Sequence, residues 1–190
     1  MEHVTPLLER LAALVHQSVR DQGAQYGLLP IHVQVLSYLA RANRYSDLPI
    51  AIAEYFGITR GTVSQTLTVL ERKGYLQRTA DARDKRRVHF KLTTAGRRVL
   101  QDSWASRIEA ALGSLPNGGA ELEDALRGLL ASLQRINGQR SFGVCRQCAH
   151  FLAEGKGWRC GLTREPLLAQ ETERICREWT AGRDATGSSR

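Results

Sequence analysis

A capped helix followed at once by two short strands is the pattern that most constrains the fold of this chain. Thr59 can cap a helix over residues 60–73, and Gly74 marks the end of that helix. Strand-like stretches follow at 75–79 and 88–92, and the charged sequence ADARDKRR separates them. The order predicts a helix that leads into a hairpin with a basic tip.

Helical periodicity covers most of the remaining chain up to residue 137. Apolar residues recur at helical spacing in five further stretches: 6–21, 30–40, 48–56, 94–112 and 120–136. Three short helices followed by a hairpin form a winged helix-turn-helix, which we expect over residues 30–93. The predicted fold class is therefore mainly α (α+β), with additional helices on both sides of the winged domain.

Positive charge is concentrated around the predicted hairpin. Residues 72–98 contain ten Lys or Arg against two acids, and this local excess of eight equals the formal net charge of the whole chain. A segment that carries all of the excess charge favours binding of phosphate over a merely solvated face. The pattern predicts binding to double-stranded DNA.

The predicted DNA-reading surface combines the first two turns of the helix at 60–73 with the hairpin tip. Short polar and amide side chains in a major groove can contact base edges and phosphates, while a basic hairpin reaches a minor groove or the backbone. The candidate DNA-binding residues are Arg60, Thr62, Ser64, Gln65, Thr66, Arg83, Lys85, Arg86 and Arg87.

The stretch ITRGTVSQTLTVLERKGYLQRTADARDKRRVHFKLTTAG resembles the DNA-binding core of the MarR (multiple antibiotic resistance regulator) family. The resemblance extends over about residues 7–137, and the wing sequence from Asp81 to Arg86 is its most specific part. It implies that Asp81 and Arg83 brace the wing and contact the DNA backbone, with Arg86 nearest the tip. It also implies an obligate homodimer.

Leucine-rich stripes outside the winged domain support a dimer independently. The stripes at 7–19, 99–112 and 120–136 are too distant from a small winged core to be buried within one subunit, although they could pack only on each other.

We expect four regions: a helical dimerisation region (1–29 and 94–137), the winged domain (30–93), a cysteine-rich segment (138–180) and a disordered tail (181–190).

All four cysteines lie beyond the part that resembles the family. Cys145, Cys148, Cys160 and Cys176 follow the spacing C-x2-C-x11-C-x15-C, and soft thiolates suit iron–sulfur clusters and zinc. One close pair plus two isolated cysteines favours a [4Fe–4S] cluster, with zinc as the alternative and thiol or disulfide switching as a third. We assign His150 and Trp158 to packing beside this metal site.

Several functions are not expected. The N-terminus has no signal-peptide pattern and no stretch is apolar enough to cross a bilayer, so we expect a cytoplasmic protein without a membrane partner. No nucleophile elbow, phosphate loop or His-Glu metal motif occurs, so we do not expect an enzyme. His16, His32 and His89 are isolated and have no predicted role.

The combined prediction is a dimeric repressor whose operator binding responds to the cluster or redox state of the cysteine segment, through the dimer helices that precede it. One alternative is a regulator that responds to a small organic effector and carries a structural zinc. Another is an iron–sulfur electron-transfer or cluster-carrier protein that uses its basic domain for docking.

Overall fold

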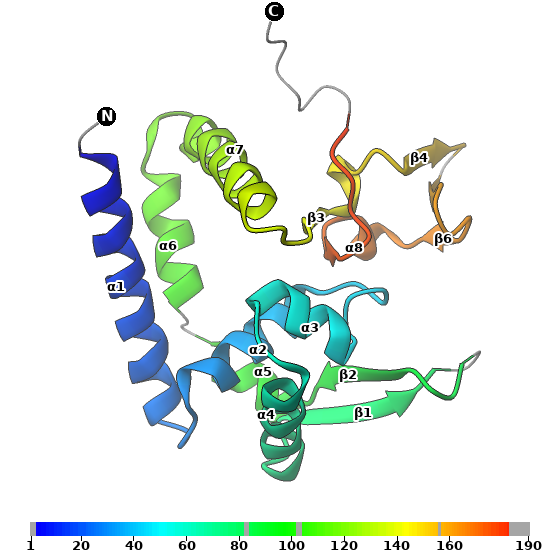
Figure 1. Ribbon diagram of the computed structural model, residues 1–190, viewed down its shortest axis with the longest axis horizontal. Helices are drawn as coiled ribbons and strands as arrows, with labels where there is room; N and C mark the ends of the chain where they lie inside the picture. The colour runs from blue at the N-terminus through cyan, green and yellow to red at the C-terminus, as the bar shows by residue number, and fades with distance from the viewer. Residues whose placement is uncertain (1–2, 82–83, 102–103, 156, 183–190) are drawn as a thin grey trace, which may run out of the picture. The chain divides into compact units, whose positions relative to one another are not determined.

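The computed structural model describes residues 3–81, 84–101, 104–155 and 157–182 (Figure 1). The longer helices are α1 (Val4–Ala24), α2 (Pro30–Arg41), α3 (Pro49–Phe56), α4 (Arg60–Arg72), α5 (Thr94–Val99), α6 (Trp104–Gly113) and α7 (Ala120–Ile136). The strands are β1 (Leu76–Ala80), β2 (Val88–Leu92), β3 (Gly143–Val144), β4 (Phe151–Glu154), β5 (Gly157–Cys160), β6 (Pro166–Leu167) and β7 (Ile175–Cys176). Short helical turns are η1 (Pro116–Gly119), η2 (Cys145–Gln147) and α8 (Ala169–Thr172).

The chain divides into two compact units, each assembled from segments that are distant in the sequence. The first contains the described residues of Met1–Ala40, Ser64–Arg78 and Lys91–Gly128. The second contains those of Arg41–Val63, Thr79–Phe90 and Leu129–Arg190. The predicted winged domain therefore contributes to both units, and the cysteine segment (residues 138–180) belongs wholly to the second.

In the first unit, α1 lies beside α6 (Figure 1). Buried side chains from α2, α4 and the strands form its apolar core: Val33, Leu36, Leu67, Leu70, Leu76 and Leu92. Burial of these apolar side chains stabilises the packing of the helices against the strands.

The predicted single helix over 94–112 is wrong, because the chain forms two helices there. The side chain of Thr93 accepts a hydrogen bond of 3.1 Å from the backbone of Gly96, so the predicted N-cap is confirmed. At the other end of α5, the backbone N–H groups of Leu100 and Gln101 donate to carbonyls three residues back. This tighter turn ends α5 before α6 begins at Trp104.

In the second unit, α3 ends at a glycine in the left-handed conformation. Gly57 has φ of 63°, and the next N–H, from Ile58, donates to the carbonyl of Ala53 at 3.1 Å. Thr59 then accepts a 3.1 Å hydrogen bond from the backbone of Thr62, which confirms it as the cap of α4. The turn between α3 and α4 is therefore closed by the residues that the sequence indicated.

The wing consists of β1 and β2, which pair in a two-stranded sheet. The predicted strands at 75–79 and 88–92 agree with these bounds to within one residue. Residues 82–83 of the intervening loop, including the candidate residue Arg83, lie outside the described residues.

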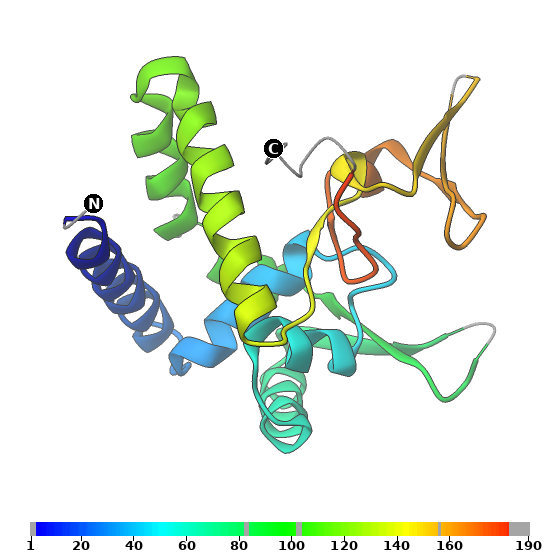
Figure 2. The ribbon, with the colours of Figure 1, turned by 45° about the horizontal axis from the view of Figure 1, so that its top comes forward.

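The cysteine segment follows α7 directly and forms two small sheets (Figure 2). β3 pairs with β7, and β5 lies between β4 and β6 in an antiparallel three-stranded sheet. A Cβ atom at Gly143 would lie 2.5 Å from the ring of Trp179, so only glycine allows the indole to pack on β3. The predicted disordered tail falls largely on residues 183–190, outside the described residues.

Among the described residues, no helix has the length and apolar character that crossing a membrane requires.

Candidate nucleic-acid interface and cysteine site

The start of α4 exposes the polar side chains that the sequence assigned to DNA reading. Arg60, Thr62, Ser64 and Gln65 are all exposed. The Thr62 hydroxyl lies 2.9 Å from the hydroxyl of Thr59, so the cap orients one of these side chains. The exposed set can offer guanidinium, hydroxyl and amide groups to base edges and phosphates.

The assignment of Thr66 to the DNA-binding set is wrong. Thr66 is only 4% exposed, next to buried Leu67 and three residues after buried Val63. At this position the helix faces the core, so the side chain of Thr66 cannot reach a base edge without unfolding. The sequence contained this signal, because Thr66 continues the apolar stripe of α4 at i+3 from Val63.

The described part of the wing loop is folded around Asp81 and Asp84. The Asp81 carboxylate accepts a 2.8 Å hydrogen bond from the backbone of Asp84, and Asp84 accepts one of 3.0 Å from the backbone of Arg86. Lys85, Arg86 and Arg87 are exposed, and the Arg87 guanidinium lies 3.6 Å from Asp84. The two carboxylates thus hold the backbone of a loop that presents three cations to solvent.

His89 links this wing to the loop between α2 and α3. Its Nδ1 lies 2.5 Å from a carboxylate oxygen of Asp47, and its Nε2 lies 2.9 Å from Asp81. Burial by itself would lower the pKa of His89, but the hydrogen bonds to Asp47 and Asp81 outweigh it and raise the pKa above its ordinary value. The prediction that His89 is isolated is therefore wrong; its two partners lie 42 and 8 positions away in the sequence.

All four cysteines line one small pocket in the second unit. Its walls also include the aromatic ring of Phe151, the buried Leu167, and Tyr45 from the winged domain. The thiols of Cys145 and Cys176 are within hydrogen-bonding distance of each other. Residues from three separate stretches of the segment, 145–148, 160 and 176, are therefore brought together at a single place.

The hydrogen bond between the thiols of Cys145 and Cys176 shifts their pKa values in opposite directions. Their mutual hydrogen bond raises the pKa of Cys145 and lowers the pKa of Cys176 to about 6. Asn43 and the backbone near Glu178 further favour the Cys176 thiolate. Across the described residues, no three His, Cys, Asp or Glu side chains already stand in an arrangement that could hold a metal ion.

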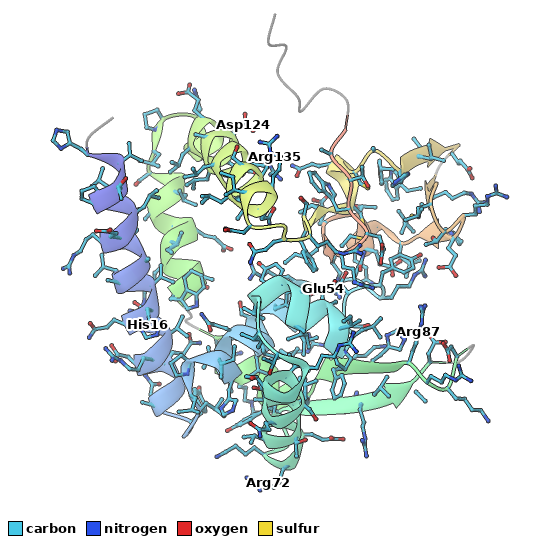
Figure 3. The ribbon with its side chains drawn as sticks, viewed as in Figure 1. His16, Glu54, Arg72, Arg87, Asp124 and Arg135 are labelled. Atoms are coloured by element: carbon cyan, nitrogen blue, oxygen red, sulfur yellow. The ribbon has the colours of Figure 1, made fainter. Side chains whose placement is uncertain are left out.

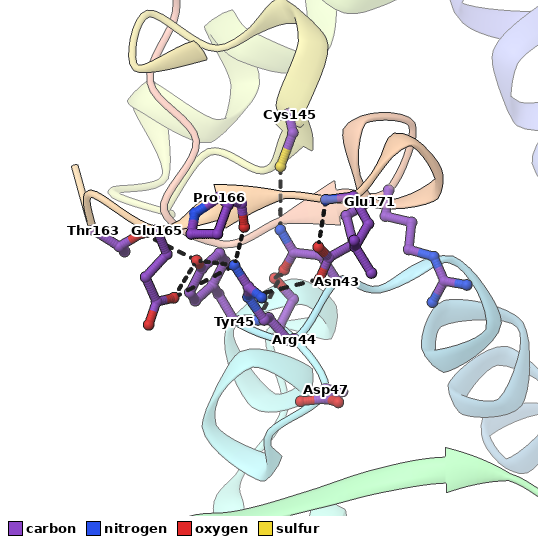
Figure 4. Close-up of polar contacts among 12 residues, drawn as sticks. Asn43, Arg44, Tyr45, Asp47, Cys145, Thr163, Glu165, Pro166 and Glu171 are labelled. Atoms are coloured by element: carbon purple, nitrogen blue, oxygen red, sulfur yellow. Dashed lines mark hydrogen bonds and ion pairs between the residues drawn. The ribbon is translucent and has the colours of Figure 1, made fainter. Parts of the chain in front are cut away.

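The cysteine site is attached to the winged domain through the buried side chain of Asn43. The side-chain nitrogen of Asn43 donates to the Sγ of Cys145 at 3.2 Å, and its oxygen accepts from the Ser46 hydroxyl at 2.8 Å (Figure 4). Its backbone N–H donates to the carbonyl of Ile175 at 3.0 Å, beside Cys176. The 42–47 loop between α2 and α3 therefore contacts the cysteine site both at Cys145 and next to Cys176.

An ion pair and further hydrogen bonds strengthen this attachment on both sides of Asn43. The Arg177 guanidinium makes two hydrogen bonds of 2.8 Å to Glu54 of α3, and its backbone donates to Ser46 at 2.8 Å. On the other side, Arg44 donates to the carbonyl of Pro166 at 2.7 Å, and the Tyr45 hydroxyl donates to Glu165 at 2.6 Å (Figure 4). No pattern in the sequence indicated these pairs, because each joins residues more than 100 positions apart.

Part of the chain, including most of the winged domain, matches one protein-family model. Residues 26–87 match the family model described as "MarR family". None of the curated protein sequences compared matches this chain.

Solved structures from two bacteria share the fold. A MepR mutant from a multidrug-resistant Staphylococcus aureus clinical isolate is 29% identical and covers 70% of this chain and 100% of its own, with a TM-score of 0.57. The S. aureus MepR–DNA complex is 24% identical and covers 69% and 96%, also with a TM-score of 0.57. CouR from Rhodococcus jostii RHA1, bound to p-coumaroyl-CoA, is 24% identical and covers 68% and 88%, with a TM-score of 0.51.

These likenesses define the class of the fold. The chain has the winged helix fold of MarR-type regulators, as the sequence predicted. The matches include almost all of each MepR chain, yet they leave roughly three tenths of this chain uncovered.

Proposed function

We propose that this chain is a dimeric, DNA-binding transcription repressor of the MarR type, whose operator binding depends on a metal centre held by Cys145, Cys148, Cys160 and Cys176. The observation that carries the proposal is the exposed start of α4 beside a basic wing, in a fold that MepR shares in its complex with DNA. The helix would read base edges in a major groove, and the wing would contact phosphates or a minor groove.

Exposed apolar side chains support the dimer. α1 and α7 leave several leucines between 40% and 62% exposed: Leu7, Leu11, Leu14, Leu122, Leu126, Leu130 and Leu133. Monomeric proteins rarely expose repeated leucines at helical spacing along two helices. A second copy of the chain would bury these stripes on a two-fold axis, with one winged domain per operator half-site.

The cysteine pocket contains the four thiols that a four-thiolate metal centre would require. Its four sulfurs are the soft ligands that zinc and iron–sulfur clusters require, and Phe151 and Leu167 give it apolar walls. The four thiols would have to move together around a bound ion, because no three of them already stand in a metal-holding arrangement.

The close approach of two thiols favours one zinc ion over a cluster. Tetrahedral Zn–S bonds of about 2.3 Å place sulfur ligands about 3.8 Å apart, which suits a hydrogen-bonded pair such as Cys145 and Cys176. A [4Fe–4S] cluster binds each thiolate to a different iron and spreads the sulfurs further apart. Zinc is therefore our first candidate, and the cluster predicted from the cysteine spacing is the second.

The contacts of the cysteine segment suggest how it would influence DNA binding. Asn43 and Ser46 receive the segment on the 42–47 loop, and Asp47 of the same loop bonds His89 at the wing. A change at the cysteines would therefore reach the wing through this loop, in addition to the route through the dimer helices that the sequence suggested.

The experiment measures DNA binding and metal content together. Fluorescence anisotropy with a duplex selected from random sequences should give at least a hundredfold preference over unselected DNA for a specific regulator. Metal analysis of anaerobically purified protein should give one zinc per chain; iron with equal sulfide would assign the cluster instead. Equal affinity for selected and random DNA, together with iron and sulfide, would favour an electron-transfer or cluster-carrier protein.

Removal of the metal distinguishes a sensor from a structural site. We expect chelated protein to bind the selected duplex at least tenfold more weakly than loaded protein at the same dimer concentration. Equal affinities would favour the alternative in which a small organic effector, such as the coenzyme A thioester in the CouR structure, controls DNA binding and the zinc is structural.

A further inference from the structure

A broad groove in the second unit has the wing on one side and the cysteine segment on the other. Its volume is about 600 Å³. Arg86 and Arg87 line it from the wing, Arg60 from the start of α4, and Leu162 and Thr163 from the turn after β5. Figure 3 shows Arg87 on the wing, below the cysteine segment.

The groove is positively charged. Four arginines line it against one carboxylate, Glu178. That carboxylate is already paired with two arginines, at 3.2 Å from Arg177 and 3.3 Å from Arg140. Arg177 is also bonded to Glu54, and Arg87 lies 3.6 Å from Asp84, so the excess positive charge at the groove rests mainly on the exposed Arg60 and Arg86.

The position of the groove matches the path of a DNA strand. A recognition helix in a major groove and a wing in the neighbouring minor groove are separated by one phosphate backbone. Arg60 stands at the first of these elements and Arg86 and Arg87 at the second, so the backbone between them would run along this groove. The opposite wall, Leu162 and Thr163, would then lie beside the same phosphates.

We infer that the groove holds a phosphodiester backbone of the operator, and that the 161–164 turn of the cysteine segment is part of the DNA-binding surface. The inference rests on the proposed DNA-binding function and extends it to a region that the sequence assigned only to metal binding. The excess of positive charge along the groove favours a polyanion such as a phosphodiester strand.

The turn is held by the cysteine site. The backbone N–H of Arg164 donates to the carbonyl of Cys160 at 2.7 Å, and the N–H of Cys160 donates to the carbonyl of Glu165 at 2.9 Å. The Thr163 hydroxyl also lies 3.0 Å from the hydroxyl of Tyr45. A displacement of Cys160 would therefore move one wall of the groove directly, a shorter route from the cysteines to DNA than the one through His89.

Charge variants at Leu162 test the inference. Leu162 is 50% exposed on the groove wall, so a charged side chain can replace it without a cavity in the core. Leu162→Lys should tighten binding to the selected duplex and steepen its salt dependence by about one unit, because it adds one phosphate contact. Leu162→Glu should weaken binding by about tenfold or more and make the salt dependence shallower.

Leu168 provides the matched control. It is a 60% exposed leucine of the same segment, at the start of α8, and is not among the described residues that line the groove. Leu168→Lys and Leu168→Glu make the same changes in net charge, so they measure the effect of overall charge alone. Metal content and circular dichroism should be equal in all four variants.

The outcomes separate this inference from the proposed function. Opposite shifts for the two Leu162 variants, with shifts at least fivefold smaller at Leu168, support a backbone contact at the groove. If the unmodified chain selects an operator and the Leu162 and Leu168 variants behave alike, the inference is overturned while the regulator remains. If the unmodified chain shows no preference for any duplex, the proposed function itself fails.

Discussion

The side-chain nitrogen of Asn43 donates a 3.2 Å hydrogen bond to the Sγ of Cys145, a residue 102 positions further along the chain. Asn43 lies in the loop between the first two helices of the winged domain, whereas Cys145 begins the cysteine pocket. The Asn43 oxygen accepts from the Ser46 hydroxyl and the Tyr45 backbone, so the orientation of the amide is fixed. One buried side chain therefore ties the thiol site to the helix-turn-helix.

Replacement of Asn43 should destabilise the fold and also make the cysteine pocket more accessible. We expect Asn43→Ala to lower the free energy of unfolding by about 2 kcal/mol, because the variant leaves buried partners without their hydrogen bonds. The Cys145 thiol should also react faster with a thiol reagent. Urea unfolding and the thiol reaction rate measure the two effects, and the exposed Asn137→Ala serves as control.

The pair of Glu54 and Arg177 should make the free energy of unfolding depend on pH in the acidic range. Hydrogen bonds from Arg177, opposed by burial and aided by the charges of Arg177 and Arg140, lower the pKa of Glu54. A carboxyl whose folded pKa is depressed stabilises the fold above its unfolded pKa, and this contribution is lost as pH falls through the folded value.

Glu54→Gln removes this contribution. At neutral pH we expect it to lower the free energy of unfolding by roughly 1–2 kcal/mol, in line with a charge-assisted, partly exposed pair. The difference from the unmodified chain should shrink as pH falls below about 4.5, the ordinary value of such a carboxyl. A difference that stays constant between neutral and acid pH would show that ionisation of Glu54 does not contribute to stability.

Periodicity and caps were sufficient to predict the winged domain. The bounds of α7, β2 and the caps Thr59 and Thr93 agree with the structure, because each depends on residues within one or two turns of the chain. The break after α5 was missed because the apolar spacing continues across it. The local backbone turn at Leu100, rather than the pattern, decides where that helix ends.

The contacts that join the cysteine segment to the winged domain could not be predicted. The cysteine spacing predicted that the four thiols form one site, and all four line the same pocket. Spacing carries no information on which surface receives the segment, since Asn43, Arg44 and Glu54 meet partners more than 100 positions away. Only the fold brings these partners together.

Gln65 and Thr66 are neighbours in sequence with opposite expected effects on DNA recognition. Gln65 is exposed on α4 and Thr66 is 4% exposed. Gln65→Ala should change the preferred operator bases and weaken the binding free energy for the original site by about 1–3 kcal/mol, because a side chain that reaches base edges in the DNA major groove is lost. Thr66→Val should leave the preferred sequence unchanged, and selection from random duplexes by the three proteins would reveal the difference.

His89 should make the wing sensitive to alkaline pH. Because its pKa in the folded chain is raised above the ordinary 6.5, its bonds to Asp47 and Asp81 are fully favourable below that value and weaken as pH rises through the folded pKa. Above that pH, Asp47 and Asp81 lose the positive charge between them, and the base of the wing should loosen. Operator affinity should therefore fall as the pH is raised from about 6 to about 8.5.

His89→Gln tests this assignment, because a neutral amide can keep one hydrogen bond but cannot carry the charge. The variant should bind the operator more weakly than the unmodified chain at about pH 6, and the two affinities should converge as the pH approaches 8.5. His16→Gln, a change of the exposed histidine on α1, should retain the full pH dependence. If His89→Gln keeps the pH dependence of the unmodified chain, a group other than His89 must titrate, and the bridge between Asp47 and Asp81 would then contribute only to the static shape of the wing.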